Sequence, residues 1–327
     1  MRVGFDATPA ATQHAGVGRY TRELLHALMQ LDPSDEYRLL VAARHDEATR
    51  LREQLPPGAI RSIRRLPVSE RWVTAAWQRL RLPLAVERVI GAVDVFHGPD
   101  FVLPPAKAPS VVTIHDLSFL VRPDLGDPGL VAYLANAVPR VLASADRVIA
   151  VSAAVATEIV ERFPTVQDRV VAIPNGVRLP SADAPRRSTS RPGVLIVGTI
   201  EPRKNHLMVE GPSDARLEQL YADADVCVYP SWYEGFGLPA LEAMARGVPV
   251  VASDIPSLRE AAGNAAHYAR PGEAEAIASH IAMLLGDLEA ANRAARAGRS
   301  HAANYSWERA ALATRRVYGQ LAAGFVS

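Results

Sequence analysis

Two glutamates flank a glycine-rich turn in the stretch "YPSWYEGFGLPALEAMARGVPVVAS", residues 229–253. An apolar run precedes them, and Pro239 suits the start of a helix, so we expect Glu234 in a loop and Glu242 in the first helical turn. An acid in a first turn complements the helix dipole, which is enough to explain Glu242. Glu234 has no such explanation. A carboxylate beside two glycines, whose backbone can approach a ligand closely, is suited to accepting hydrogen bonds from hydroxyl groups.

Two adjacent cations, Arg203 and Lys204, follow another apolar run in "VLIVGTIEPRKNH". At the carboxyl end of a buried strand they would be partly desolvated, and an anionic ligand would offset that cost. A diphosphate meets this demand, whereas the alternative is a solvated basic loop. Acids for hydroxyl groups and cations for phosphates together indicate a nucleotide sugar as ligand.

A glycine turn follows the first apolar run, in "AGVGRYTRELLHAL", where Gly16 and Gly18 bracket the turn and a helix is expected to begin near Arg19. Free amides at a helix N-terminus favour a bound phosphate. The spacing differs from the dinucleotide fingerprint and lacks a P-loop lysine, so neither of those sites is predicted. A glycine turn that allows tight packing between strand and helix is an equal alternative.

The elements that must position these residues are short runs rich in Val and Ile, which alternate with helical patterns. Continuous apolar runs are typical of parallel strands buried on both faces, and ligands of such sheets bind beyond the carboxyl ends of the strands. We therefore predict an α/β protein with two Rossmann-like domains facing each other across a cleft. The predicted parts are an N-terminal domain (1–177), a Pro-, Ser- and Arg-rich linker (178–192), a C-terminal domain (193–305) and a C-terminal helix (306–327), for which a return to the N-terminal domain is one option.

Composition excludes several classes of function. The 327 residues carry a formal net charge of +1, which gives no reason to expect a nucleic-acid partner. One cysteine, Cys227, excludes an internal disulfide and a cysteine-cluster metal site. The start "MRVGFDA" lacks the pattern of an export signal and no apolar run approaches the length of a membrane span, so we expect a cytoplasmic protein.

Two further patterns leave alternatives open. Asp223 and Asp225 form an Asp-x-Asp in "YADADV", but they stand where a helix runs into a strand, and we predict no bound metal and no cofactor. Residues 61–83 combine six arginines with Trp72 and Trp77. This segment suits a peripheral contact with an anionic membrane surface or with an acceptor, and equally a helix whose aromatic face packs inward.

Six motifs in this order resemble the glycosyltransferase family 4 pattern of retaining enzymes with the GT-B fold: "AGVGRYTREL", "VVTIHDLSF", "IPNGV", "EPRKN", "LYADADV" and "YEGFGLPALEAMARGVPVVAS". The resemblance covers nearly the whole chain. It implies that Glu234 contacts the transferred sugar, that Glu242 contacts the nucleotide ribose, and that Arg203 and Lys204 hold the diphosphate. It also implies a role for His115 near the reacting sugar and donor contacts in two backbone segments, made by Gly16 and Gly18 in one and by Gly235, Phe236, Gly237 and Leu238 in the other.

One departure from the family pattern concerns the segment between Asn205 and Ser213, which consists only of "HLMVEGP". The resemblance leads us to expect about two more strands with their helices here. A buried parallel strand needs neighbours on both sides, so the second domain is predicted to be shortened, and we interpret the gap as missing sequence.

These observations predict a retaining, metal-independent glycosyltransferase. It would move a hexose, mannose above all, from GDP-mannose or a UDP-hexose to a glycan or lipid-linked glycan. Because the second domain is shortened, the alternative is a non-catalytic protein that binds nucleotide sugars. The patterns do not determine the oligomeric state.

Overall fold

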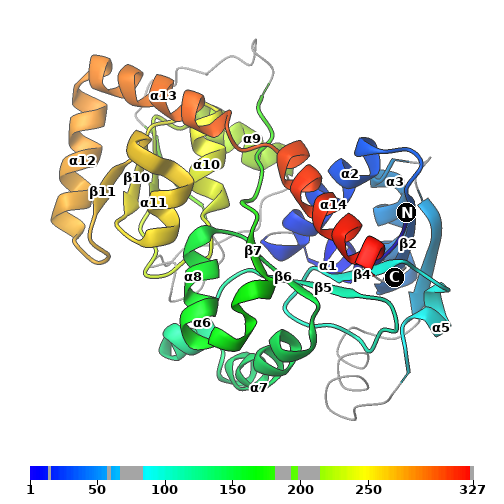
Figure 1. Cartoon of the computed structure of the whole chain (residues 1–327). Coiled ribbons are helices and arrows are strands. Elements are labelled where there is room, and N and C mark those ends of the chain that lie inside the picture. Colours follow the sequence, from blue (N-terminus) through cyan, green and yellow to red (C-terminus); the bar gives the residue numbers. More distant parts are fainter. Residues whose placement is uncertain (14–15, 57–59, 67–83, 181–192, 198–213, 325–327) are drawn as a thin grey trace.

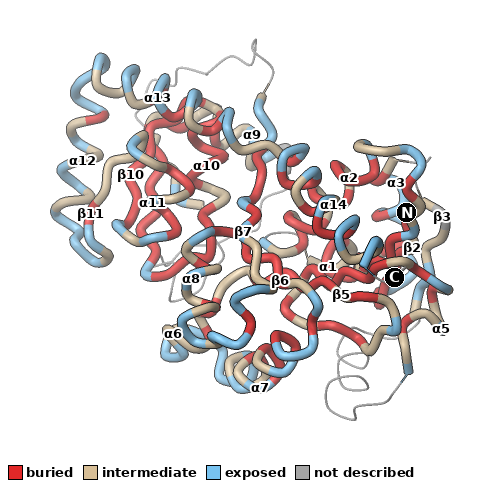
Figure 2. Tube along the Cα trace, in the orientation of Figure 1, coloured by how far each residue is buried: buried red, intermediate tan, exposed pale blue. Residues whose placement is uncertain are grey.

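The computed structural model of the chain describes residues 1–13, 16–56, 60–66, 84–180, 193–197 and 214–324. Two α/β lobes are visible in Figure 1, and each contains a parallel sheet. The inner strands of both sheets are buried, whereas the helices at the outer end of the second lobe expose much of their surface (Figure 2). The predicted pair of Rossmann-like domains is therefore confirmed. Most of the predicted linker lies outside the described residues.

Within the described residues the first sheet has seven strands in the order β3-β2-β1-β4-β5-β6-β7, and neighbouring strands are parallel. Its core strands are continuous runs of buried apolar residues, as the Val- and Ile-rich pattern predicts. The strands are β1 (Arg2–Asp6), β2 (Glu36–Ala42), β3 (Ile60–Leu66), β4 (Val95–Gly98), β5 (Ser110–Ile114), β6 (Arg147–Ala150) and β7 (Val170–Ala172).

Strand β3 corrects one sequence interpretation. The arginine-rich segment 61–83 was considered as a helix with an inward aromatic face, but residues 61–66 belong to β3 and pair with β2. The exposed Arg64 and Arg65 suit the edge position that β3 occupies, because charged residues on an edge strand oppose pairing with another chain. Trp72 and Trp77 lie outside the described residues, so the membrane and acceptor alternatives stay predictions.

The helices around the first sheet include α2, which follows a short helix after β1. Its first residue is Val17, two residues before the predicted start, and Gly16 caps it with a φ of 56°. The described helices of this lobe are α1 (Thr8–Thr12), α2 (Val17–Leu31), α3 (His45–Gln54), α5 (Glu87–Ile90), α6 (Ser118–Val121), α7 (Pro128–Ser144) and α8 (Ala153–Arg162).

The second sheet has four strands in the order β11-β10-β9-β8, again parallel. They are β8 (Val194–Ile196), β9 (Val226–Tyr229), β10 (Val250–Ser253) and β11 (His267–Ala269). The helices that follow in the chain are α9 (Asp214–Asp223), α10 (Leu238–Ala245), α11 (Pro256–Ala262), α12 (Ala274–Gly286), α13 (Leu288–Ala302) and α14 (Trp307–Gly324).

Strand β8 is apolar but poorly covered. Val194 is 46% exposed and Ile196 is 47% exposed, although the neighbouring strand β9 is buried along its length. Within the described residues β8 pairs with β9 and stands at the edge of the sheet. An apolar parallel strand at an open edge is unusual, because such strands normally have a neighbour on each side. The predicted shortening of the second domain falls beside this strand, in residues 206–212, which lie outside the described ranges.

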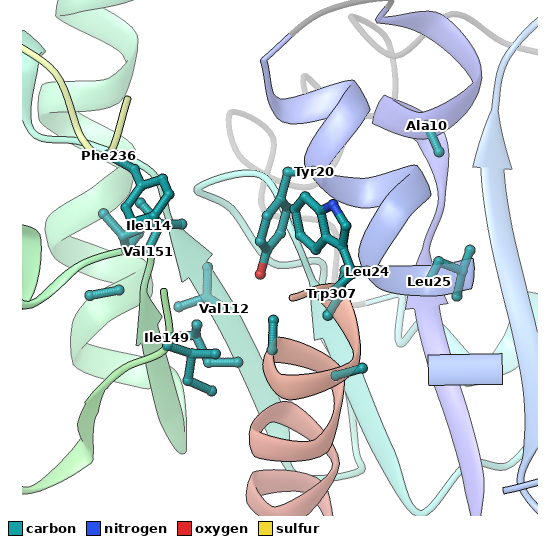
Figure 3. Close-up of a cluster of buried hydrophobic side chains, with 14 of the residues drawn as sticks. Ala10, Tyr20, Leu24, Leu25, Val112, Ile114, Ile149, Val151, Phe236 and Trp307 are labelled. Carbon is teal, nitrogen blue, oxygen red and sulfur yellow. The ribbon is translucent and has the colours of Figure 1, made fainter. Parts of the chain in front are cut away.

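The last helix, α14, lies against α2 of the first lobe rather than beside the second sheet (Figure 1). Its first residue, Trp307, packs edge-on against Tyr20, with ring centroids 5.9 Å apart (Figure 3). Further along, the Tyr318 hydroxyl lies 2.5 Å from His97 Nδ1, and Thr113 Oγ1 lies 2.8 Å from His97 Nε2. This buried polar network ties the C-terminal helix to β4 and β5.

Candidate active site

The Glu234 loop follows β9 and is pressed against the ends of strands in the first domain. The Ser231 hydroxyl donates to Glu234 Oε1 over 2.7 Å, and Glu234 is buried. Ser152, which follows β6, donates its hydroxyl to the Gly235 carbonyl over 2.7 Å. A Cβ atom on Gly235 would lie 1.7 Å from the His115 carbonyl oxygen. This position therefore requires glycine, because the two domains touch there through their backbones.

Phe236, Gly237 and Leu238 complete the turn into α10. Gly237 caps the helix with a φ of 105°, a conformation that favours glycine. The Phe236 ring is buried, and Figure 3 shows it beside Ile114 and Val151, at the ends of the first-domain strands. The side chain of Phe236 thus belongs to the core that joins the domains, which leaves the backbone of this turn as the part that could contact a ligand.

Glu242 differs from its prediction in place and in partners. It lies beyond the first turn of α10, which contains no acid, so the helix dipole does not explain it. Its side chain is 5% exposed, and Arg19 of α2 lies 3.0 Å from Oε1. The Tyr221 hydroxyl donates to Oε2 over 3.0 Å. Burial raises the pKa of Glu242, while the nearby Arg19 lowers it and so favours the carboxylate.

His115 follows β5 and is held as a neutral ring. Its Nε2 lies 2.6 Å from the Pro99 carbonyl oxygen, which can only accept, so Nε2 carries the proton and Nδ1 is the acceptor. Burial lowers the pKa of His115 to about 4. The rings of Tyr20 and Phe101 lie 4.7 Å and 5.6 Å from the imidazole. The ring is therefore oriented before any ligand arrives.

The glycine turn at the start of α2 is tightly built. A Cβ atom on Gly18 would lie 2.0 Å from the Gln13 carbonyl oxygen, so tight packing by itself explains a glycine there. Gly16 has open space around its Cα and a positive φ. A phosphate contact in this turn remains a prediction, and the two other predicted phosphate ligands, Arg203 and Lys204, lie outside the described residues.

Sequence reasoning missed three residues at this end of the first sheet. Asp6 is the last residue of β1, and Asp100 follows β4, close to Asp116. Burial, together with the charges of Asp6 and Asp116, raises the pKa of Asp100 to about 6, although Gln13 Nε2 donates to it over 3.0 Å. The third residue is Arg19. The sequence places the two aspartates at the ends of apolar strands and Arg19 beside the glycine turn, and this position could have identified them as site residues.

The Asp-x-Asp pair has local structural partners. Gln219 donates to Asp223 over 2.9 Å, and the Gly193 amide donates to Asp225 over 2.8 Å. Across the described ranges, no group of three or more His, Cys, Asp or Glu side chains could hold a metal ion. Within the same part of the chain, no helix has both the length and the apolar character needed to cross a membrane.

Solved structures share this architecture along almost the whole chain. Sucrose-phosphate synthase from Thermosynechococcus elongatus superposes with a TM-score of 0.75 at 20% identity, over 99% of this chain and 100% of that one. The Anabaena protein Alr3699/HepE in complex with UDP-glucose superposes with a TM-score of 0.63 at 16% identity, over 98% of this chain and 100% of that one. At these identities the likeness establishes the GT-B fold.

A relative of similar extent is the O-antigen chain mannosyltransferase B of Escherichia coli, which is 29% identical and aligns over 97% of this chain and 99% of its own. That alignment spans 385 positions, more than the 327 residues of this chain, so the relative has residues for which this chain has none. The MMP alpha-(1->4)-mannosyltransferase of Mycolicibacterium hassiacum is 39% identical over 112 residues, which are 33% of this chain and 27% of its own.

Two family models match consecutive parts of the chain. Residues 14–180 match the model described as Glycosyltransferase Family 4, and residues 189–301 match the model described as Glycosyl transferases group 1. Together they include most of both lobes, and the residues Glu234, Glu242 and His115 lie within them. The chain therefore belongs to the family 4, group 1 glycosyltransferases.

Proposed function

We propose that the protein is a retaining, metal-independent hexosyltransferase. It moves mannose, or another hexose, from GDP-mannose or a UDP-hexose to a glycan or lipid-linked glycan. Two relatives are named as mannosyltransferases, which supports mannose, and a structural neighbour was solved with UDP-glucose, which keeps a UDP donor in the proposal. We place the reaction in the cytoplasm, with an acceptor carried at the inner face of the membrane as one option.

One observation carries this proposal: two buried carboxylates flank a turn whose backbone touches the strand end that bears His115. The contact is tight enough that a Cβ atom on Gly235 would lie 1.7 Å from the His115 carbonyl oxygen. Acids at this position can accept hydrogen bonds from sugar hydroxyls on one side and from the ribose on the other. We assign the transferred sugar to Glu234 and the nucleotide ribose to Glu242.

His115 takes a binding role in this proposal rather than that of an acid. Because its Nε2 proton is committed to the Pro99 carbonyl and its pKa is lowered to about 4, the ring stays neutral and offers Nδ1 as an acceptor. A hydroxyl of the hexose is the fitting donor. Protonation of the leaving group by His115 is not part of the mechanism.

The departing nucleoside diphosphate gains charge as the bond between the anomeric carbon and the phosphate oxygen breaks. Arg203 and Lys204 are proposed to stabilise that charge, which is electrostatic catalysis directed at the transition state. The acceptor hydroxyl attacks from the same face, and its proton passes to the departing phosphate oxygen. No covalent enzyme intermediate is needed, and the anomeric configuration is retained.

The test uses the purified full chain with GDP-mannose, UDP-glucose or UDP-galactose and a lipid-linked saccharide acceptor. Transfer should occur with one donor, in the presence of EDTA, and NMR of the product should show the donor's anomeric configuration. Glu242→Gln should weaken binding of the free nucleoside diphosphate, whereas Glu234→Gln should act mainly on the sugar-bearing donor. Inversion of configuration, or full loss of activity in EDTA, would contradict the mechanism.

Arg203→Ala offers a second test of the diphosphate contact. Since a charge-assisted hydrogen bond contributes roughly 1.5–3 kcal/mol and about 1.4 kcal/mol is tenfold, transfer should slow by tenfold or more. Unchanged kinetics in a folded Arg203→Ala variant would show that the loop carrying Arg203 does not contribute to the site.

A non-catalytic nucleotide-sugar-binding protein is the second candidate, and the exposed edge of β8 favours it. Val194 and Ile196 are about half exposed where the family's second sheet would continue. The same assay separates the two candidates, because a binding protein would bind the donor in calorimetry without either hydrolysing it or transferring its sugar.

A further inference from the structure

An ion pair joins the two domains at the proposed ribose acid. Arg19 Nη1 of the first domain lies 3.0 Å from Glu242 Oε1 of the second domain. The Arg19 side chain is 20% exposed and that of Glu242 is 5% exposed, so water screens this pair much less than a surface pair. Removal of one partner from such a pair leaves an uncompensated charge.

The backbone that carries Arg19 is held rigidly. Arg19 follows Gly18, which has no space for a Cβ atom beside Gln13. The neighbouring Arg22 donates from Nη1 to the carbonyl oxygens of Ala10, over 3.0 Å, and of Gln13, over 2.6 Å. These contacts fix the first turn of α2 against the preceding loop, so Arg19 projects from a defined point.

Glu242 is equally constrained from its own domain. Tyr221 donates to Oε2, and Arg246 donates from Nη1 to the Glu242 carbonyl oxygen over 2.8 Å. Arg246 also forms an ion pair with Glu218. Among the described residues, each carboxylate oxygen thus has one side-chain donor, Arg19 at Oε1 and Tyr221 at Oε2. Because a carboxylate has about four lone-pair sites, two remain for the hydroxyls of a ligand.

We infer that Arg19 is a positioning residue, which holds the Glu242 carboxylate in the orientation that accepts the two hydroxyls of a ribose. The inference rests on the proposed function, since it takes Glu242 as the ribose ligand. Arg19 acts through Glu242 and need not touch the nucleotide. Because the two residues come from different domains, ribose recognition depends on the domains being together.

The consequence is a coupling between domain approach and donor recognition. When the domains separate, the Glu242 carboxylate loses Arg19 and keeps Tyr221, its other side-chain partner among the described residues. Its orientation is then fixed from one side. A nucleotide that binds Glu242 in the oriented state favours the arrangement in which Arg19 contacts it, because ligands shift an equilibrium toward the state that they bind better.

The experiment measures binding of free GDP and free UDP to the full chain by calorimetry, in a double-mutant cycle. The variants are Arg19→Met, Glu242→Gln and both together. Arg19→Met should weaken the nucleotide that binds the wild type by about tenfold, and the double variant should bind no more weakly than Glu242→Gln alone. Arg19→Lys should recover part of the lost affinity, because it restores a charge near Oε1.

Arg50→Met serves as the matched control. Arg50 forms an exposed ion pair with Asp46 on α3, so its loss removes the same charge from the first domain without touching the site. Its affinity for the nucleotide should equal that of the wild type. Thermal unfolding of each variant shows whether the chain still folds. If Arg19→Met does not fold, Arg19→Lys takes its place in the cycle.

The outcomes separate the inference from the proposed function. If Glu242→Gln weakens binding and Arg19→Met does not, or strengthens it, the inference fails and the ribose assignment stands. If the two losses multiply in the double variant, Arg19 contacts the nucleotide independently, which also overturns the inference. If Glu242→Gln leaves binding unchanged, or neither nucleotide binds the wild type, the proposed function fails at its ribose contact.

Discussion

Gly235→Ala tests the contact that joins the two domains at the site. The added Cβ atom would lie 1.7 Å from the His115 carbonyl oxygen, whereas real Cβ atoms essentially never approach other atoms within 3.0 Å. The obstacle is backbone, which no side-chain rotation can relieve. The domains must therefore move apart at this point by more than about 1 Å, since overpacked groups are accommodated by shifts of the backbone.

The cost follows from what this shift breaks. Ser152 donates to the Gly235 carbonyl oxygen over 2.7 Å, and a displacement of that size takes the pair beyond hydrogen-bond range. Overpacking of a closely packed region typically costs about 1–3 kcal/mol. We expect Gly235→Ala to lower the stability of the chain by that amount, with no donor present.

Thermal unfolding and small-angle scattering measure the two effects. The variant should unfold at a lower temperature than the wild type and have a larger radius of gyration. Gly319→Ala is the matched control, because Gly319 lies inside α14 with open space around its Cα and alanine there should stabilise by roughly 0.5–1 kcal/mol. A Gly235→Ala chain that matched the wild type in stability and in radius of gyration would refute the close approach of the domains.

Two other predictions concern buried polar groups in the first domain. Burial raises the pKa of Asp100 from 3.8 to about 6. As the pH rises, Asp100 therefore loses its proton at a lower pH in the unfolded chain than in the folded chain. Its contribution to the free energy of unfolding is full below pH 3.8 and is lost as the pH rises to about 6. Asp100→Asn should therefore be more stable than the wild type above pH 6, by on the order of 3 kcal/mol, and should lose that advantage near pH 4. Urea titrations at several pH values measure this difference. A gain in stability that did not depend on pH would contradict the raised pKa of Asp100. Tyr318→Phe should destabilise the chain by about 1–3 kcal/mol in urea denaturation, because it leaves the buried His97 Nδ1 without its hydrogen-bond partner. An effect below about 0.5 kcal/mol would contradict a stabilising role for this hydrogen bond.

The shortening of the second domain is a prediction that rests on a resemblance, which places a gap after Asn205. Val194 and Ile196 of β8, the described strand before that gap, are about half exposed. The alignment with the Escherichia coli relative extends over more positions than this chain has residues, which agrees with a segment lacking here. The intact mass of the purified protein is the measurement that decides whether those residues are lacking in the molecule.

Local patterns determined most of the strands, the loop position of Glu234 and the start of α10 near Pro239. A strand or a helix start depends on residues close together in the chain, so Val-rich runs and the "GFGLP" turn are enough to predict them. Strand β3 was not predicted from local pattern, because "IRSIRRL" at a sheet edge carries as much charge as a surface helix.

Only the tertiary structure decided how the site residues are partnered. Glu242 was predicted to complement a helix dipole, but its partner is Arg19, which comes from the other domain and from the far end of the chain. The tautomer of His115 depends in the same way on the Pro99 carbonyl, which follows a neighbouring strand. A sequence pattern determines which residue types follow one another, whereas the charge state and orientation of a buried group depend on which atoms the fold brings within about 3 Å of it.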